Sequence, residues 1–326
     1  MSVSIASKAF PALALSLFVL IACSPSHHPS GSSHTAEPSM DSLVSAEWLN
    51  ANLDDPDLVV LDASVTVAPD GNGGFQILNG RAAYDEGHIP TAGFADLMGD
   101  LADSESPHGY AVPTPVAFAT AMGKLGVGDG TRVVLYDTSG GPWAARVWWM
   151  LRWVGYDNVA LLSGGLNAWT SAGFELSTDP ATEPVRTLTV NLRPELIVEK
   201  EEVLAAIDNE SVELIDAMPA AHYRGEFSMY ARPGHIPTAS NVPSNSLINE
   251  AGLFKSDDEL AALFEGDRDM RAITYCGGGI AASADAFIMT RLGYKDVAVY
   301  TASLQEWASE PDLPMVTGPD PSPSTE

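Results

Sequence analysis

Basic side chains are scarce in this sequence. Its 326 residues include 16 lysines and arginines against 43 aspartates and glutamates, and the formal net charge is −27. With so few cations the chain cannot neutralise a run of phosphates, so the composition argues against nucleic acid as a partner. The same charge disfavours electrostatic docking on an anionic membrane surface.

Cysteine is equally scarce, and the only two are Cys23 and Cys276. Two cysteines cannot build a disulfide framework or a zinc site by themselves. His27, His28 and His34 have no thiol or carboxylate cluster beside them, so we interpret them as part of a solvated tether. We therefore expect no metal, and nothing in the chain calls for an organic cofactor.

Long apolar runs are absent as well, and the run from Ala9 to Ala22 is short for a membrane span. Lys8 precedes this run and Cys23 follows it, which is the pattern of a signal peptide. The segment Leu20-Ile21-Ala22-Cys23 resembles the bacterial lipobox. That resemblance implies a signal peptide over 1–22, a lipid on Cys23, and anchoring in the cell envelope through the lipid alone.

In lipoproteins, a serine rather than an aspartate after the cysteine favours the outer membrane, facing the periplasm, and Ser24 stands there. The alternative is an ordinary secretory signal with an incidental cysteine. Residues 23–41 and 317–326 are rich in serine and proline, so we expect a flexible tether and a disordered tail.

An internal repeat organises the residues between these ends. Five blocks recur in the same order, and their offsets fall from 154 to 138 residues, so the first copy has extra loop residues early on. The paired blocks are Leu58–Ala63 with Val212–Ala217, Gly87–Ala92 with Gly234–Ala239, Arg132–Asp137 with Arg271–Cys276, Gly155–Val159 with Gly293–Val297, and Leu166–Trp169 with Leu304–Trp307. The chain is a tandem duplication.

Each copy alternates short apolar runs with helical patterns, which predicts an α/β fold. Runs such as Val59–Leu61 and Val133–Leu135 lack polar alternation, as is typical of parallel strands buried on both faces. We predict two tandem domains over 42–180 and 197–316, each a parallel sheet covered by helices on both faces, with a linker over 181–196. The predicted helices include Pro115–Leu125, Trp143–Val154, Lys200–Ile207, Asp257–Phe264 and Ala282–Leu292.

One loop contains the residues that we expect to be reactive. Cys276 ends a predicted strand, Gly277, Gly278 and Gly279 follow, and a helical pattern begins near Ala282. Glycines allow several backbone N–H groups to turn toward the sulfur, and a helix N-terminus adds to the stabilisation of an anion. This context favours a reactive thiolate over an inert buried cysteine.

These residues resemble the two-domain rhodanese-type sulfurtransferases from about Ser42 to Met315. The resemblance rests on both Gly-His-Ile-Pro blocks, the Ala145–Met150 and Gly164–Trp169 segments, and the loop Cys276–Ala281. It implies that the loop, including Ile280 and Ala281, cradles a persulfide in the second domain. The first domain is then an inactive copy, because Asp137 stands where its cysteine would be.

The same resemblance implies a substrate arginine at Arg224, a second at Arg232, and a contribution of His88 to acid–base steps. A guanidinium suits the anionic group of a small sulfur donor. The loop lacks the basic residues of thiosulfate-preferring members and is nearer to the 3-mercaptopyruvate type, although it lacks that type's hydroxyls at Gly278 and Ala281.

The predicted reaction moves sulfur from a small anionic donor, with 3-mercaptopyruvate favoured, through a Cys276 persulfide to a thiol or cyanide-like acceptor. Two alternatives remain open at this point. The protein is a thiosulfate:cyanide-type sulfurtransferase, or it is a non-catalytic binding module of the envelope.

Overall fold

The computed structural model describes residues 40–71 and 74–319. The predicted signal peptide, the lipidation site Cys23, most of the tether and the last seven residues lie outside this part of the chain. Within it, no helix is both long enough and apolar enough to cross a membrane.

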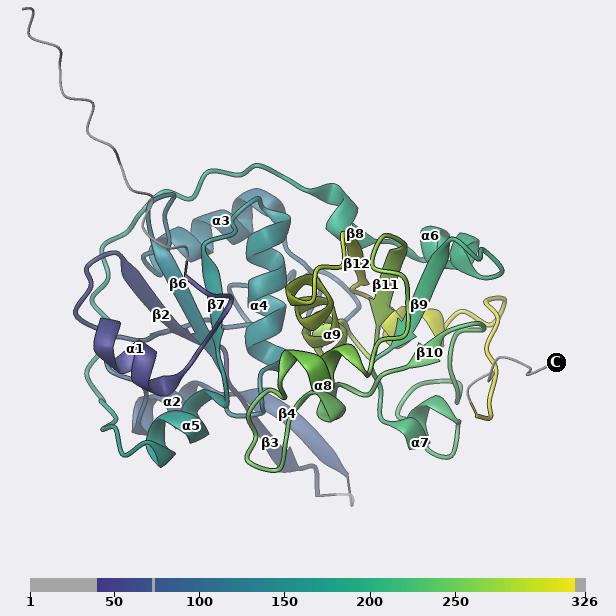
Figure 1. The fold of residues 1–326 in the computed structure, drawn as a ribbon, viewed down its shortest axis with the longest axis horizontal. Coiled ribbons are helices and arrows are strands. Elements are labelled where there is room, and N and C mark those ends of the chain that lie inside the picture. Colours follow the sequence, from purple (N-terminus) through teal and green to yellow (C-terminus); the bar gives the residue numbers. More distant parts are fainter. Residues whose placement is uncertain (1–39, 72–73, 320–326) are drawn as a thin grey trace, which may run out of the picture. The chain divides into compact units, whose positions relative to one another are not determined.

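Two five-stranded parallel sheets form the framework (Figure 1). In hydrogen-bonding order the first contains β1 (Leu43–Val44), β7 (Val159–Leu162), β6 (Arg132–Tyr136), β2 (Leu58–Asp62) and β5 (Gly93–Phe94). The second contains β8 (Ile197–Val198), β12 (Asp296–Tyr300), β11 (Arg271–Tyr275), β9 (Val212–Asp216) and β10 (Ser240–Asn241). The two orders correspond strand for strand, which confirms the predicted duplication and fold class.

Helices cover both faces of each sheet, because successive residues of a buried strand point to opposite sides. In the first sheet, Val60 and Val134 join one apolar cluster with Trp169, whereas Val59 and Val133 join another. The helices of the first repeat are α1 (Ala46–Asn52), α2 (Arg81–Glu86), α3 (Pro115–Lys124), α4 (Pro142–Trp153) and α5 (Gly165–Ser171). Those of the second are α6 (Lys200–Ala206), α7 (Ala220–Tyr223), α8 (Asp257–Ala261), α9 (Ile280–Arg291) and α10 (Ser303–Trp307).

The extra residues of the first copy include an antiparallel hairpin, β3 (Val65–Pro69) with β4 (Phe75–Asn79), which the sequence predicted only as loop. Short 3₁₀ turns occur at Pro194–Leu196 and Ser244–Leu247. Helix α9 begins at Ile280, two residues before the predicted Ala282, because Gly279 already adopts the left-handed conformation that starts it.

Helices α4 and α9 pack against each other and join the two repeats. The ring of Trp148 on α4 meets the ring of Phe287 on α9 edge to face, with centroids 5.0 Å apart. Both helices follow the strands that end at the two equivalent loops, so this contact brings those loops close together.

Candidate active site

The loop of the first repeat shows what this turn can hold. Asp137 follows β6, and its carboxylate accepts four backbone N–H bonds of 2.7 to 3.0 Å. The donors are Ser139, Gly141, Trp143 and Ala144, the last two being in the first turn of α4. Burial raises the pKa of this carboxyl and the four donors oppose the rise. The turn is therefore an anion cradle built from backbone.

Cys276 occupies the same place in the second repeat. It follows β11, it is only 2% exposed, and the turn after it leads directly into α9. The carbonyl oxygen of Asp137 accepts the N–H of Leu166, and that of Cys276 accepts the N–H of Leu304 in the matching position. The side chain of Cys276 thus stands where the first repeat keeps a carboxylate.

At each of the three positions after Cys276, any side chain larger than that of glycine would clash with neighbouring atoms. A Cβ at Gly277 would lie 1.7 Å from the hydroxyl oxygen of Tyr230, and one at Gly278 would lie 2.0 Å from Nε2 of Gln305. Gly279 has a φ of +78°, and a Cβ there would lie 2.7 Å from a backbone oxygen. The glycines therefore let neighbouring side chains approach the loop from outside as well as letting it turn.

The first of these neighbours is Arg146, which α4 supplies from the other repeat. Its guanidinium is completely buried, and Nη1 lies 2.9 Å from the position of a Cβ on Gly279. Nη2 donates to the carbonyl oxygen of Tyr110 at 2.9 Å, whereas Nε and Nη1 have no hydrogen-bond partner among the described residues. Burial lowers the pKa of Arg146 to about 10, and the charge of Cys276 opposes that shift, so the side chain is cationic at neutral pH.

Two tyrosines border the same space. Burial raises the pKa of Tyr230, and the charge of Cys276 raises it further, so Tyr230 is a neutral hydroxyl beside the loop. Tyr110 packs edge to face against Trp143 with ring centroids 5.2 Å apart, and burial raises its pKa too. Both rings lie against the glycines that follow Cys276, Tyr230 at Gly277 and Tyr110 at Gly278.

A pair of hydrogen bonds fastens the Tyr110 segment to the second repeat. Gln305 on α10 accepts the N–H of Gly109 at 2.8 Å and donates to its carbonyl oxygen at 3.3 Å. A cavity of about 530 Å³ lies beside this contact, lined in part by His108, Tyr110 and Gln305.

Ser303 links the start of the Cys276 loop to the end of β12 by two hydrogen bonds. Its Oγ accepts the N–H of Cys276 at 3.1 Å and donates to the carbonyl oxygen of Tyr300 at 2.7 Å. Ser303 is fully buried with a φ of +54°, the value that Gly165 has at the equivalent position. A serine in this conformation carries strain that its two hydrogen bonds offset.

The comparisons with known proteins agree with this geometry. The rhodanese-like domain pattern matches residues 45–172 and again 199–310. The chain belongs to the rhodanese-like family.

Its relatives include a 3-mercaptopyruvate sulfurtransferase of Escherichia coli, 34% identical over 84% of this chain and 97% of that protein. A mitochondrial thiosulfate/3-mercaptopyruvate sulfurtransferase of Arabidopsis thaliana is 32% identical over 86% of this chain and 78% of that protein. The crystal structure of an Escherichia coli 3-mercaptopyruvate sulfotransferase superimposes with a TM-score of 0.71 at 34% identity, covering 81% of this chain and 99% of that one.

The other predicted site residues of this rhodanese-like protein lie elsewhere. Arg232 donates to four backbone carbonyl oxygens, those of Trp307, Ala308, Glu310 and Leu313, at 2.6 to 3.0 Å. Arg224 forms a two-bond ion pair with Glu226 at the surface. Within the described chain, no contact joins either guanidinium to Cys276, and the bonds of Arg232 are those of a residue that holds the chain in place.

His88 also has structural partners. It is 1% exposed, stacks on Tyr84 at 4.0 Å, and places its ring nitrogens 2.9 Å from the carbonyl oxygens of Tyr84 and Asp179. His235 stacks on Tyr223 in the same manner in the second repeat. The role of His88 in acid–base steps stays a prediction, and these contacts favour a histidine that secures its turn.

Arg146, Tyr230, Gln305 and Ser303 are the site residues that the sequence did not identify. Only Arg146 left a signal, as a charged side chain among the apolar residues in the middle of a predicted helix. In the part of the chain that the structure describes, no three histidine, cysteine or acidic side chains gather as metal ligands.

Proposed function

We propose that this protein is a sulfurtransferase that takes sulfur from 3-mercaptopyruvate and carries it as a persulfide on Cys276. The observation that carries the proposal is the replacement of Asp137 by Cys276 in a duplicated anion cradle. A carboxylate held by four N–H groups in one copy supports a stabilised sulfur anion in the other.

In the first half-reaction the Cys276 thiolate attacks the sulfur of the donor. A sulfur–sulfur bond forms, the carbon–sulfur bond breaks, and its electron pair leaves with pyruvate as the enolate, which takes up a proton. In the second, a thiol or cyanide attacks the outer sulfur. The sulfur–sulfur bond then breaks and its electron pair returns to Cys276 as thiolate.

Arg146 is the cation that the geometry offers to the donor. Its buried guanidinium has two unpartnered nitrogens beside the loop, and an anion there would compensate a charge that is costly to bury alone. Tyr230, a neutral hydroxyl at the same loop, can donate to the donor's oxygen or sulfur. We assign anion binding to Arg146 in preference to Arg224 and Arg232, whose guanidinium groups are already occupied.

A thiosulfate donor is the second candidate, because relatives carry both substrates in their names. It is less favoured, since the loop from Cys276 to Ser283 contains no lysine or arginine and a dianion would meet Arg146 alone. A non-catalytic binding module would have no need for a cysteine in the cradle.

Intact mass and kinetics test the function together. Incubation with 3-mercaptopyruvate should add one sulfur atom to the wild-type protein and nothing to Cys276→Ser, whose fold is checked by circular dichroism. The ratio of kcat/KM values should favour 3-mercaptopyruvate over thiosulfate. A higher kcat/KM with thiosulfate would show that thiosulfate is the preferred donor and would leave the persulfide mechanism intact. Addition of sulfur to Cys276→Ser would show that Cys276 does not carry the persulfide.

We also propose that the protein is a lipoprotein of the bacterial envelope, attached through Cys23 to the outer membrane and facing the periplasm. The support is the sequence Leu20-Ile21-Ala22-Cys23 after a short apolar run. A thiol or a cyanide-like nucleophile available in that compartment would be the sulfur acceptor.

A further inference from the structure

A groove opens in the second repeat at the end of the sheet opposite Cys276. It lies between the loop that precedes β9 and the loop that precedes β11, and its cavity measures about 620 Å³. Cys276 follows the other end of β11. The groove is therefore separate from the site of sulfur transfer.

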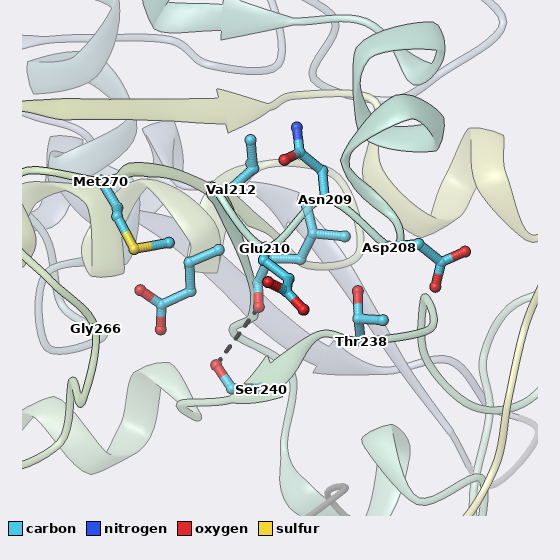
Figure 2. A pocket seen from close by; sticks show the side chains of 10 residues that line it. Asp208, Asn209, Glu210, Val212, Thr238, Ser240, Gly266 and Met270 are labelled. Carbon is cyan, nitrogen blue, oxygen red and sulfur yellow. Dashed lines mark hydrogen bonds between the residues drawn. The ribbon is translucent and has the colours of Figure 1, made fainter. Parts of the chain in front are cut away.

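The groove has an apolar floor and an acidic rim. Figure 2 shows Val212 and Met270 among the side chains that line it, with the carboxylates of Asp208 and Glu210 nearby. Burial raises the pKa of Glu213, which also lines it, and the charge of Glu265 raises that pKa further. No lysine or arginine is among its described lining residues. A cation entering the groove would meet negative potential over an apolar surface.

The equivalent region of the first repeat is filled. The two repeats share a strand register here, since Leu58 pairs with Arg132 as Val212 pairs with Arg271. In the first repeat the linker between the domains runs over the loops before β2 and β6, and its Arg186 lies between them.

Arg186 contacts both loops and the end of α3. Its Nη2 donates to the carbonyl oxygen of Pro56 at 2.9 Å and its Nη1 to Asp57 at 3.2 Å, both directly before β2. Its own N–H donates to Gly123 at 2.9 Å, and a Cβ on Gly128, before β6, would lie 2.8 Å from the Cβ of Arg186. An extended segment with one arginine thus fills this position.

The residues after Arg186 continue the contact. Leu188 is buried in the apolar core, and Thr189 donates its N–H and its hydroxyl to Asp129 at 2.7 and 2.6 Å. The matching place in the second repeat, directly before β9, holds Glu210 and Ser211, and the described chain puts nothing between them and Met270 that would close the cavity.

The chain after the second repeat begins with the same contact as the linker after the first repeat, but the residues that follow are acidic. Ser177 bridges to His88 in the first repeat, and Val316 bridges to His235 in the second. Residues 320–326, Asp-Pro-Ser-Pro-Ser-Thr-Glu, contain two acidic side chains and no basic one. Their charge does not match that of the groove, whereas a basic segment of another protein would match it.

We propose that this groove binds an extended segment of a partner protein, which places an arginine against Glu210 and Glu213 as the linker places Arg186 against Asp57. Recognition combines the guanidinium–carboxylate contact with an apolar residue on the floor near Met270. The partner is basic at this segment, which complements a chain of net charge −27.

The linker itself supplies the probe. A fluorescent peptide with the sequence of residues 180–190 is titrated with the full chain, and binding is followed by anisotropy. We expect saturable binding that weakens at least tenfold in Glu210→Lys/Glu213→Lys, and for the peptide with Arg186→Glu. The matched control Asp100→Lys/Glu250→Lys makes the same charge change at exposed sites away from the groove and should leave binding intact.

Sulfur transfer and the melting temperature show that each variant is folded, and Glu213→Gln replaces the lysine variant if that one is unstable. Absence of saturable binding, retention of binding in the groove variants, or equal loss in the control would overturn the proposal. So would tighter binding after deletion of residues 320–326, which would make the tail the occupant. If the wild-type chain sediments as a dimer and only the groove variants sediment as monomers, the occupant of the groove is a second copy of the chain.

Discussion

The guanidinium of Arg146 lies against the loop that carries Cys276, although the two residues belong to different repeats. Nη1 of Arg146 is 2.9 Å from where a Cβ of Gly279 would be, and the side chain is fully buried. The charge on the sulfur acts on the pKa of this arginine. The second repeat thus supplies the proposed nucleophile, and the first supplies the cation beside its loop.

Replacement of Arg146 should move activity and stability in different directions. Arg146→Met removes a buried charge that has no carboxylate partner, so the melting temperature should stay the same or rise. Removal of the cation that lies beside Gly279 should lower kcat/KM by about 10²-fold or more. Steady-state kinetics and calorimetry on the same preparation measure both.

Arg152→Met is the matched control, because Arg152 is on the same helix but pairs with Asp157 at the surface. It should keep nearly full activity. If Arg146→Met retains activity within twofold, the anion is held by another group and Arg224 becomes the next candidate.

The sequence predicted the duplicated sheets well because their cause is local. Buried parallel strands need uninterrupted apolar runs, and the repeated Gly-His-Ile-Pro turns leave a readable pattern. In each repeat a tyrosine hydroxyl accepts an N–H from that turn, Tyr136 from Ile89 and Tyr275 from Ile236. The same hydrogen bond occurs at both Gly-His-Ile-Pro turns, so the repeated motif in the sequence indicates a repeated local structure.

The site was predicted only in part, because its second half depends on packing between repeats. Cys276 and its glycines are contiguous, and the chemistry of a thiol before a helix can be inferred from them. Arg146 is about 130 residues away in sequence, and only the contact of α4 with α9 brings it to the loop. Arg232 looked available as a substrate ligand because its partners are backbone carbonyls, which leave no trace in the sequence.

The close approach of Tyr230 makes the first glycine of the loop a sensitive position. Gly277→Ala places a Cβ 1.7 Å from the tyrosine hydroxyl and 2.8 Å from Cζ, so the ring or the loop must move. We expect persulfide formation to fall by about 10²-fold, as small displacements of reacting groups do. Intact mass after donor treatment follows it.

The double variant Gly277→Ala/Tyr230→Ala should recover part of that loss, because it removes the obstacle. Gly130→Ala, where a Cβ has open space, should have no effect. Strictly additive losses in the double variant would show that the clash is not the cause.

Asp285 gives the protein an unusual dependence of stability on pH. This residue of α9 is fully buried, neither carboxyl oxygen has a hydrogen-bond partner among the described residues, and burial raises its pKa well above the ordinary value. A raised pKa means that the folded state keeps a proton that the unfolded state loses above pH ~4. The contribution of Asp285 to stability therefore falls as pH rises above that value, until the folded pKa is reached.

Asp285→Asn should accordingly stabilise the protein at pH 7 and have less effect near pH 4. A gain of about 1 kcal/mol would raise the melting temperature by roughly 2–4 °C. Calorimetry of both proteins at the two pH values tests this. A loss of stability at pH 7 would show that the carboxylate has a favourable partner.

Replacement of Cys23 tests the proposed envelope anchor. Cys23→Ala should prevent lipid attachment and move the protein from the membrane fraction to the soluble fraction, with sulfur transfer unchanged because Cys276 is unaffected. Cell fractionation with metabolic labelling by a fatty acid measures both. Labelling that persists in Cys23→Ala would locate the lipid elsewhere, and an unlabelled wild-type protein would leave only an ordinary secretory signal.

The Asp137 carboxylate that fills the first cradle has a consequence for each repeat taken alone. The first repeat has Asp137 in the cradle and Arg146 on its helix, whereas the second has Cys276 in the cradle and Ala284 at the matching helical position. On the proposed assignment each repeat lacks a group that the other supplies, so we expect neither repeat to transfer sulfur when it is produced alone.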